Sequence, residues 1–406
     1  MNINLIKTTV ALACTAALAI LFLLFYCQTF FDFGNLAKDR ILLSPIFAFC
    51  TTPILFWVSA YLCRRFSPGA SGSNMENLNL GLKNAENQKA FSFLGLKTVA
   101  ICTISSLIAT LGGGSLGREG PSTQMSAGIF FVTANRLKKN LPKISLENWI
   151  YAGAGIGLAV AFGAPIAGLT YVGEKVSKLK KLPQLKKILL AVPAIFIFAL
   201  ITEEATPLFV TGQINFHYDI KEILALALVA LICGLLASLF KIIALYFYQK
   251  FVAIKSKKWH LVPLGTGLAV SIISACYGIH AVGDGVKTVN DALASTETFL
   301  SFGEVAARFF NTILTFASGS AGGIVAPSIA IGSGIGSVVS EIFTNLDPKI
   351  FILGGMAAFL GSTICLPITA SLIVLEAASQ SFFILPFLLF SAFVALFCAN
   401  FLHLRA

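Results

Sequence analysis

The sequence has few charged residues for its length. Only 12% of its 406 residues are Asp, Glu, Lys or Arg, whereas 57% are hydrophobic. A soluble protein of this size needs far more polar surface than this composition supplies. The composition therefore excludes a soluble globular protein and predicts an all-α polytopic membrane protein.

Reactive clusters are also missing. The nine cysteines are scattered without a CxxC pair, so neither a disulfide framework nor a cysteine metal site is expected. The sequence has no GxSxG motif and no phosphate-binding P-loop. The histidines show no catalytic or metal-ligand spacing: His217, His260, His280 and His403. We therefore expect no enzyme activity, no cofactor and no metal.

Apolar runs dominate the chain instead. A membrane-crossing helix needs about 20 mostly apolar residues. Candidate crossings lie near 8–30, 41–63, 149–173, 188–203, 221–248, 260–280 and 382–404. Shorter runs bounded by glycine or proline predict broken or re-entrant helices near 96–111, 124–134, 303–317, 324–343, 351–364 and 367–380. The first run is longer than the apolar core of a signal peptide, so we expect it to remain as a transmembrane helix.

The net charge of +11 comes mainly from short loops. Basic residues gather at 63–66, 135–143, 175–187 and 255–260, and an even number of crossings can separate each loop from the next. This is the pattern of cytoplasmic loops in membrane proteins. It predicts that these loops and the start of the chain face the cytoplasm, embedded in a lipid bilayer, and it argues against a nucleic-acid partner.

The chain contains an internal repeat. Residues 163–175 can be laid over 365–377, which pairs Pro165 with Pro367 and Glu174 with Glu376. In the same order, 117–122 matches 323–328 and 70–74 matches 281–285. We therefore expect a single transmembrane domain, 1–406, made of two halves, 1–201 and 220–406, which the loop 202–219 joins. By analogy with other transporters, the halves are expected to be inverted and to bind the substrate where they meet.

The second pair of matched segments has a chemical meaning. A Gly-x-x-x-Pro-Ser run before an apolar stretch predicts a loop that opens a helix with free N–H groups. Such a helix start carries partial positive charge and can hold an anion inside the membrane. Two starts, Gly117–Ser122 and Gly323–Ser328, with a third at 69–74, predict a site where backbone donors converge on a small anion.

These motifs resemble a known family. "GASGSN" at 69–74, "GREGP" at 117–121 and "GGIVAPS" at 322–328 are similar to the three anion-binding signatures of the CLC family of chloride channels and anion/proton antiporters. The resemblance implies the CLC-like fold of two inverted repeats, chloride transport through a pore in each subunit of a homodimer, and a bacterial plasma-membrane location without regulatory domains. It implies that Glu119 is the gate and carries protons. It implies anion-binding positions at Ser73, Gly117, Arg118, Gly120, Gly323, Ile324, Val325 and Ala326.

The gate assignment agrees with the physics of a buried carboxyl group. Burial and a nearby anion favour the protonated form of Glu119, whereas helix N-termini and Arg118 favour the ionised form. The side chain is therefore switchable, and its ionised form can occupy an anion site as a tethered anion. The alternative is a simple buried ion pair between Glu119 and Arg118. We expect Arg118 to be an electrostatic or structural neighbour more than a ligand.

The chain departs from the family pattern at several positions. Asn74 and Glu76 replace a glycine and a proline of the first signature, and Val325 replaces the phenylalanine of the third. Lys175 stands where exchanging members often carry an inner glutamate, which leaves the adjacent Glu174 as a possible inner proton path. The family also supplies a tyrosine hydroxyl from a final helix, and the sequence indicates no equivalent.

These departures leave the transport mode open. The fluoride-exporting branch also has the valine and lacks the inner glutamate, so a fluoride/proton antiporter and a passive chloride channel remain alternatives to a chloride/proton antiporter. A cation-coupled transporter is the alternative from a different class. It would need several carboxylates inside the membrane, and the candidates are Glu119, Asp284, Glu174 and Glu376. We expect the last two near helix ends, as solvated or capping carboxylates.

Overall fold

The computed structural model describes residues 3–139, 145–178, 207–212, 214, 219–254, 256–294, 300–343 and 345–403. Within these ranges the chain is helical and forms no β-strand. Its α-helices are Ile3–Leu43 (α1), Pro45–Phe66 (α2), Asn74–Lys83 (α3), Phe91–Leu94 (α4), Leu96–Leu111 (α5), Glu119–Leu137 (α6), Leu146–Phe162 (α7), Pro165–Lys178 (α8), Ile220–Ala253 (α10), Leu261–Tyr277 (α11), Val286–Ala294 (α12), Phe302–Ala317 (α13), Val325–Ser340 (α14), Pro348–Ile364 (α15), Pro367–Ala377 (α16) and Leu385–His403 (α17). Short 3₁₀ turns cover Pro68–Ala70, Gln88–Ala90, Lys257–His260, Gly278–Ala281 and Phe382–Ile384. The predicted crossing at 188–203 and most of the predicted loop at 202–219 lie outside the described residues.

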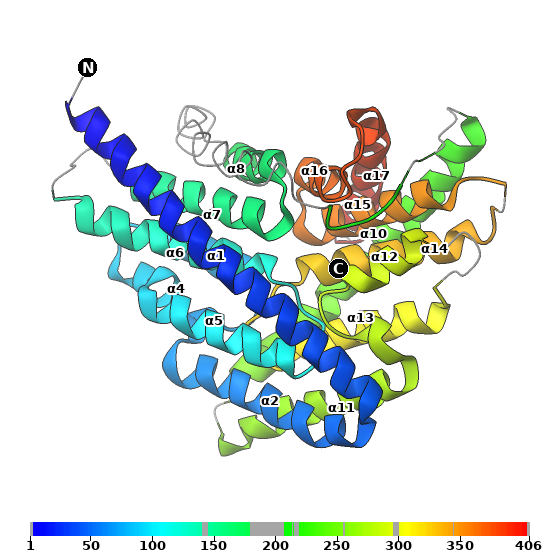
Figure 1. Cartoon of the computed structure of the whole chain (residues 1–406), viewed down its shortest axis with the longest axis horizontal. Helices are drawn as coiled ribbons and strands as arrows, with labels where there is room; N and C mark the ends of the chain where they lie inside the picture. The colour runs from blue at the N-terminus through cyan, green and yellow to red at the C-terminus, as the bar shows by residue number, and fades with distance from the viewer. Residues whose placement is uncertain are drawn as a thin grey trace.

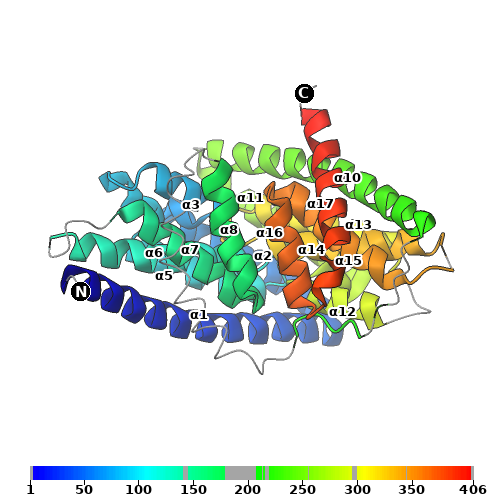
Figure 2. The same ribbon diagram turned by 90° about the horizontal axis from the view of Figure 1, so that it is seen from above.

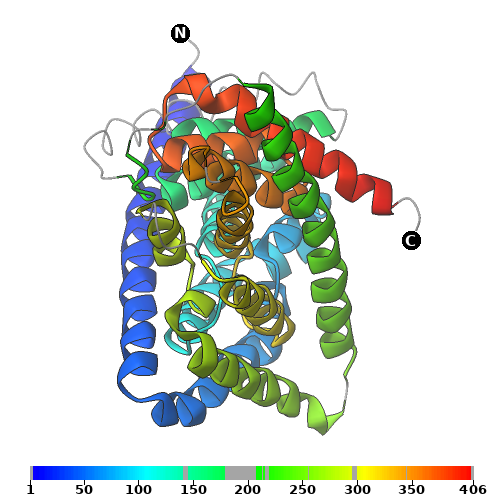
Figure 3. The same cartoon turned by 90° about the vertical axis from the view of Figure 1, so that its right-hand side faces the viewer.

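Long apolar helices form the outside of the molecule. The helices α1 and α10 lie along opposite faces (Figures 1, 2 and 3). The described residues include five helices that are long and apolar enough to cross a membrane. Large apolar side chains on the outer helices point outward, including Phe25 of α1 and Phe397 of α17, which are 74% and 75% exposed. An outward apolar surface suits contact with lipid, and helices satisfy their own backbone hydrogen bonds there.

Glycines let the inner helices pack backbone to backbone. Gly153 and Gly157 of α7 lie against the backbone of α6 at Ser126 and Ser122, where a side chain would collide. In the second half, Gly332 and Gly336 of α14 lie in the same way against α15. Small residues at this spacing are typical of close helix contacts in membranes. The α6–α7 and α14–α15 pairs therefore form tightly packed units on either side of the centre.

One predicted crossing is wrong as a single helix. Residues 149–173 form two helices, because Gly163 takes a left-handed conformation at φ 65° and Pro165 starts α8. The second half breaks in the same manner, since Cys365 has φ 57° and Pro367 starts α16. The predicted short run at 124–134 lies inside a longer helix, α6. Both α8 and α16 are consequently short, separate helices.

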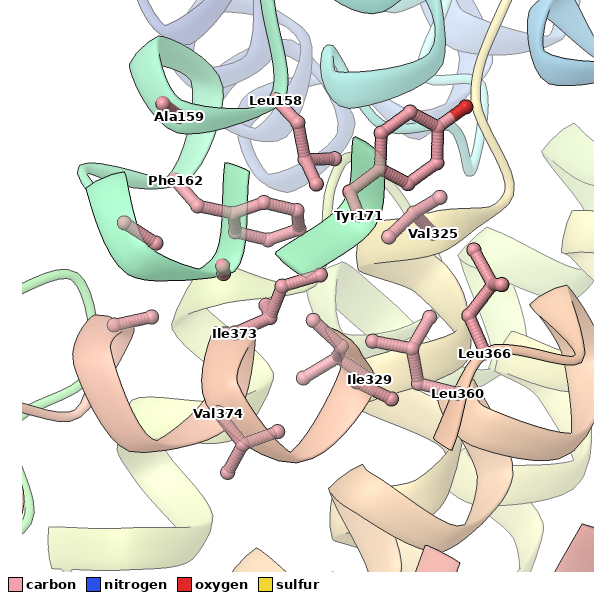
Figure 4. Close-up of a cluster of buried hydrophobic side chains, with 14 of the residues drawn as sticks. Leu158, Ala159, Phe162, Tyr171, Val325, Ile329, Leu360, Leu366, Ile373 and Val374 are labelled. Carbon is pink, nitrogen blue, oxygen red and sulfur yellow. The ribbon is translucent and has the colours of Figure 1, made fainter. Parts of the chain in front are cut away.

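Apolar side chains from both halves meet in one core. Figure 4 shows Leu158 and Phe162 of α7 and Tyr171 of α8 facing Ile329 of α14 and Ile373 of α16. All of these side chains are buried within the main hydrophobic cluster. The core therefore crosses the boundary between the two halves and fixes the central loops between them.

Two of the basic segments lie together. The guanidinium of Arg64, at the end of α2, stacks over the ring of Trp259 at 5.2 Å. Arg64 also donates a hydrogen bond to the carbonyl of Ile254. The described basic residues at 63–66 and 256–260 are therefore neighbours on one side of the molecule. Residues 140–143 and 179–187 of the other two basic segments lie outside the described residues.

Candidate anion site at two helix starts

Two matched loops of the sequence pair directly at the centre of the molecule. The amide of Gly117 donates to the carbonyl of Gly323 at 2.8 Å, and the amide of Gly323 donates to the carbonyl of Gly117 at 2.9 Å. The helices α6 and α14 begin within two residues of this pair, at Glu119 and Val325. The predicted helix starts are therefore real, and both N-termini lie at one place with their first N–H groups unpaired within the helices.

Glycine is required at this meeting point because the two loops leave no room for a side chain. A Cβ at Gly120 would lie 2.9 Å from the Cα of Gly323, and a Cβ at Gly323 would lie 2.8 Å from the amide nitrogen of Gly120. These are backbone atoms that cannot move aside. The close approach brings the positive ends of two helix dipoles together.

The carboxylate of Glu119 occupies this meeting point. The side chain is only 2% exposed, and its Oε2 accepts a hydrogen bond from the amide of Ala326, in the first turn of α14, at 3.4 Å. The same oxygen lies over Gly117, where a Cβ would overlap with it. A carboxyl group therefore lies at the N-terminus of α14, in the place that the electrostatics favour for an anion.

Arg118 turns away from this carboxylate. Its Nε donates to the carbonyl of Ala161, in the last turn of α7, at 3.1 Å. Among the described residues, Arg118 and Glu119 form no ion pair with each other. A cation at a helix C-terminus is stabilising, so Arg118 has a structural partner of its own, and the simple ion-pair alternative does not describe the geometry.

The third motif joins the same centre through its backbone. The amide of Gly72 donates to the carbonyl of Ser320 at 3.0 Å, just before the second loop. Ser73 precedes α3, and its hydroxyl does not cap that helix. Asn74, which replaces a family glycine, is buried and donates to Oε1 of Gln124 on α6 at 2.6 Å. Asn74 thus ties α3 to α6, while Ser73 faces a cavity.

That cavity has a volume of about 250 Å³. It reaches the two paired loops, where Gly120, Gly323, Ile324 and Val325 form its inner end, and Ser73 lies on its wall. Its remaining lining comes from Met75, Glu76, Asn79, Lys175, Phe240, Lys241, Ala244, Leu245, Phe316, Thr363, Ile364 and Leu366. The structure therefore gathers the predicted positions Ser73, Gly120, Gly323, Ile324 and Val325 around one space, with Gly117, Glu119 and Ala326 directly behind it.

Two features of this region are not indicated by the motifs. Lys241 of α10 lines the cavity and is the only charged residue between 223 and 248. A lone charge in a membrane helix is a functional signal, so the sequence offers a clue to it. Tyr171 of α8 is buried, and its hydroxyl donates to the sulfur of Met75 on the cavity wall at 3.6 Å. Nothing marks Tyr171, because it lies in an ordinary apolar run.

Glu174 and Glu376 each hold the start of the other's helix. Glu174 of α8 accepts from the amides of Ile368 and Thr369 at 3.4 and 3.0 Å, and from the Thr369 hydroxyl at 2.8 Å. Glu376 of α16 accepts from the amides of Ile166 and Ala167 at 2.9 and 2.6 Å. Both carboxylates therefore cap a helix of the opposite half, as the expectation of solvated or capping carboxylates allows.

Asp284 lies in a different cluster of charges. Its carboxylate is 4.0 Å from Nζ of Lys38 and accepts from the amide of Val286 at 3.2 Å. The adjacent carbonyls of Val282 and Gly283 accept from the buried guanidinium of Arg308. The carboxylates that a cation site would require are thus dispersed, and no group of three potential metal ligands occurs in the described part of the chain.

Comparisons with known proteins point in one direction. The model of the family described as voltage gated chloride channel matches residues 54–400. The H(+)/Cl(-) exchange transporter ClcA of Vibrio cholerae is 28% identical over 380 residues, which cover 86% of this chain and 76% of that protein. The protein of the same name from Citrobacter koseri is 27% identical over 375 residues, which cover 87% and 75%.

Solved structures share the fold. A slow cyanobacterial Cl-/H+ antiporter matches with a TM-score of 0.78 at 20% identity, over 98% of this chain and 95% of that chain. A CLC-type fluoride/proton antiporter matches with a TM-score of 0.78 at 22% identity, over 98% and 96%. The predicted CLC-like all-helical fold is therefore confirmed.

Proposed function

Because the chain belongs to the voltage gated chloride channel family, a family of membrane channels and transporters and not of enzymes, we propose that it moves chloride across a membrane with Glu119 as the gate. The observation that carries this proposal is the position of the Glu119 carboxylate at the N-terminus of α14, beside the pairing of Gly117 with Gly323. An ionised Glu119 fills the anion position itself. A protonated Glu119 has no charge to hold it there and yields the position to the transported ion.

The ligands of the anion are proposed to be neutral groups. They are the amides of Gly120, Ile324, Val325 and Ala326 at the starts of α6 and α14, and the Ser73 hydroxyl on the cavity wall. The Ala326 amide is the one that Glu119 occupies. Gly117 and Gly323 shape the site through the pairing of their own amides and carbonyls. Arg118 contributes its charge from a distance, since its Nε is engaged by Ala161. Binding by amides and a hydroxyl, without a direct lysine or arginine contact, is weak enough for the ion to leave.

We propose that chloride moves in exchange for protons. The matched relatives are named H(+)/Cl(-) exchange transporters, and Glu119 is a carboxyl group that changes charge as it leaves the anion position. The inner part of the proton route is less direct, because Lys175 stands where a carboxylate is common in the family. Glu174 is next to it, but its two oxygens are held by the start of α16. Water that enters the cavity is the alternative carrier.

Fluoride is the second candidate ion. Val325 lines the inner end of the cavity and takes the place of the signature phenylalanine, a substitution that also occurs in the fluoride-exporting branch. One of the structurally similar proteins is a fluoride/proton antiporter. Chloride remains the first proposal because Ser73, which the fluoride branch alters, is present and faces the cavity.

The assembly and location follow the family pattern in this proposal. Two copies are proposed to pair, each with its own pore, in a bacterial plasma membrane. The N-terminus and the basic loops are proposed to face the cytoplasm. The contact between Arg64 and Trp259 supports one part of this, that two of those loops lie on the same side.

The test uses the protein reconstituted into lipid vesicles. Chloride efflux and fluoride efflux are compared while an external electrode records proton movement, for the wild type and for Glu119→Gln. The neutral amide cannot act as a tethered anion or carry a proton, so we expect chloride flux without proton movement. The control is Glu341→Gln, an exposed glutamate at the far end of α14. Unchanged flux and proton coupling in Glu119→Gln would overturn the gate assignment.

A further inference from the structure

Three charged side chains from three helices line the cavity that reaches the paired loops. Glu76 comes from α3, Lys175 from α8 and Lys241 from α10. The two lysines are partly buried, whereas Glu76 is exposed. The formal charge of the lining is therefore positive by one, on a cavity whose inner end is the start of α14.

The rest of the wall concentrates this charge. Most of the other lining residues are apolar, including Phe240, Leu245, Phe316 and Leu366. Apolar walls have a low dielectric constant and channel the field of the few charges along the open space. A cavity of this kind raises the local concentration of ions of opposite sign, here anions.

Lys241 has a local partner, but that partner leaves its charge in place. Its Nζ donates to the thiol of Cys365 at 3.2 Å, at the C-terminal end of α15. A cation there stabilises the helix dipole, so a purely structural role must be tested against a functional one. The ammonium has three donors, and a neutral thiol does not cancel its charge.

We propose that Lys241 and Lys175 make this cavity the capture site for the transported anion on the side of the basic loops, and that Glu76 opposes them. The proposal rests on the proposed anion transport and adds a separate step to it. The anion first enters the field of the two lysines and then passes to Ser73 and the amides of α14. The lysines set how much anion is needed to fill the pathway, whereas Glu119 sets whether it opens.

The experiment measures chloride isotope exchange in vesicles with equal chloride on both sides, so that the insertion direction of the protein does not matter. The concentration for half-maximal exchange is determined for Lys241→Gln, Lys175→Gln and Glu76→Gln at low ionic strength. Each lysine variant is expected to raise this concentration by about threefold to tenfold, the effect of one unit charge at close range in a half-solvated site. Glu76→Gln is expected to lower it by a similar factor.

Two controls separate charge from structure. Lys221→Gln makes the same change at the exposed far end of α10 and should leave the half-maximal concentration unchanged. Lys241→Arg keeps the charge and should resemble the wild type. Adding an impermeant salt should shrink the difference between Lys241→Gln and the wild type, because the cavity opens to water.

The outcomes are distinguishable from those of the gate test. Saturable exchange in the wild type with opposite shifts in Lys241→Gln and Glu76→Gln supports the capture site. Shifts in the same direction, or no difference between Lys241→Gln and Lys221→Gln, overturn it and leave the gate proposal intact. A wild type without any anion exchange would instead overturn the proposed function.

Discussion

The absence of a side chain at residue 117 decides where Glu119, the proposed gate, can lie. Oε2 of Glu119 lies over Gly117, at a place that the Cβ of any other residue would fill. The same position is close to Ala326, whose amide holds the carboxylate. Gly117 is therefore the seat of the proposed gate, because it leaves the space that the Glu119 carboxyl group fills.

Gly117→Ala is expected to fold and to leave the gate displaced. The severe overlap is with the end of a flexible side chain, and the next contacts, with Ala326, are at 3.0 and 3.2 Å. Glu119 must leave the start of α14, so anion flux should rise and lose its dependence on the protonation of the gate. Anion flux from vesicles measured at two pH values checks this. If the flux of Gly117→Ala depends on pH as that of the wild type does, this role of Gly117 is wrong.

Gly120→Ala is the matched comparison for this change. Here the added Cβ meets the backbone of Gly323 at 2.9 Å, and backbone cannot swing away. We expect a lower yield of folded protein and a lower unfolding temperature in detergent. Equal stability of Gly117→Ala and Gly120→Ala would contradict this difference between a clash with a side chain and a clash with backbone.

At this scale the sequence predicts the site residues that follow a repeated motif. The glycines, Glu119 and the serine at 73 occur in patterns that have a chemical reason, and the structure brings them to one place. Lys241 and Tyr171 could not be placed in this way, because contacts between distant helices decide that they lie at the cavity. The direction of Arg118 also depends on such a contact, with the end of α7.

At the scale of helices, the breaks between helices decide the fold as much as the helices do. The apolar run at 149–173 is long enough for one crossing, and hydropathy alone predicts one. Gly163 and Pro165 interrupt it, because a left-handed residue followed by a proline ends one helix and starts the next. The repeated proline was visible in the sequence, but only the backbone conformation shows that α8 is a separate helix.

The two equivalent breaks use different residues. Gly163 has φ 65° and Cys365 has φ 57°, so a cysteine adopts in the second half the conformation that glycine adopts in the first. A residue with a Cβ pays about 1–2 kcal/mol for this conformation. The break in the second half is therefore the more strained one.

Substitutions at these two positions should change the free energy of unfolding in opposite directions. No atom lies within 4 Å of a Cβ built at Gly163, so Gly163→Ala should lower the free energy of unfolding by about 1 kcal/mol through the backbone alone. Cys365→Gly should raise it, by less because glycine is more flexible when unfolded. Unfolding temperatures in detergent measure both effects.

Controls for this pair lie in the same chain. Gly265 of α11 also has open space around its Cβ but no left-handed backbone, so Gly265→Ala should be neutral or stabilising. Cys365→Ala removes the thiol and keeps the strain, so it should be no more stable than the wild type. If Cys365→Ala stabilised the protein as much as Cys365→Gly, the strain would not be the cause.

At the scale of the whole molecule, α8 and α16 tie the two halves together. They lie beside each other in Figure 2 and run in opposite directions, because the glutamate near the end of each one reaches the start of the other. The repeat in the sequence pairs these glutamates and predicts that they behave alike. It cannot tell that each caps the opposite half, since a spacing within one helix carries no information about its partner.

This arrangement predicts how Glu174 and Glu376 behave when neutralised. Glu376→Gln and Glu174→Gln each remove a negative charge from a helix N-terminus, so each should lower the free energy of unfolding by about 1 kcal/mol. Proton coupling should be preserved in both, because both carboxylates act as caps. Unfolding temperature and proton-coupled chloride flux are measured on the same purified protein. The control for a lost cap is Glu304→Gln, because Glu304 caps α13 within one half.

The contrast between the two variants decides the remaining question about the inner proton route. Glu174 and Glu376 are equivalent by the repeat and have equivalent partners, yet only Glu174 lies next to Lys175 and the cavity. If Glu174→Gln abolishes proton movement and Glu376→Gln does not, the Glu174 carboxylate must leave α16 to carry protons. If both variants lose only stability, neither carboxylate carries protons, and the proposed proton route to Glu119 runs through water in the cavity.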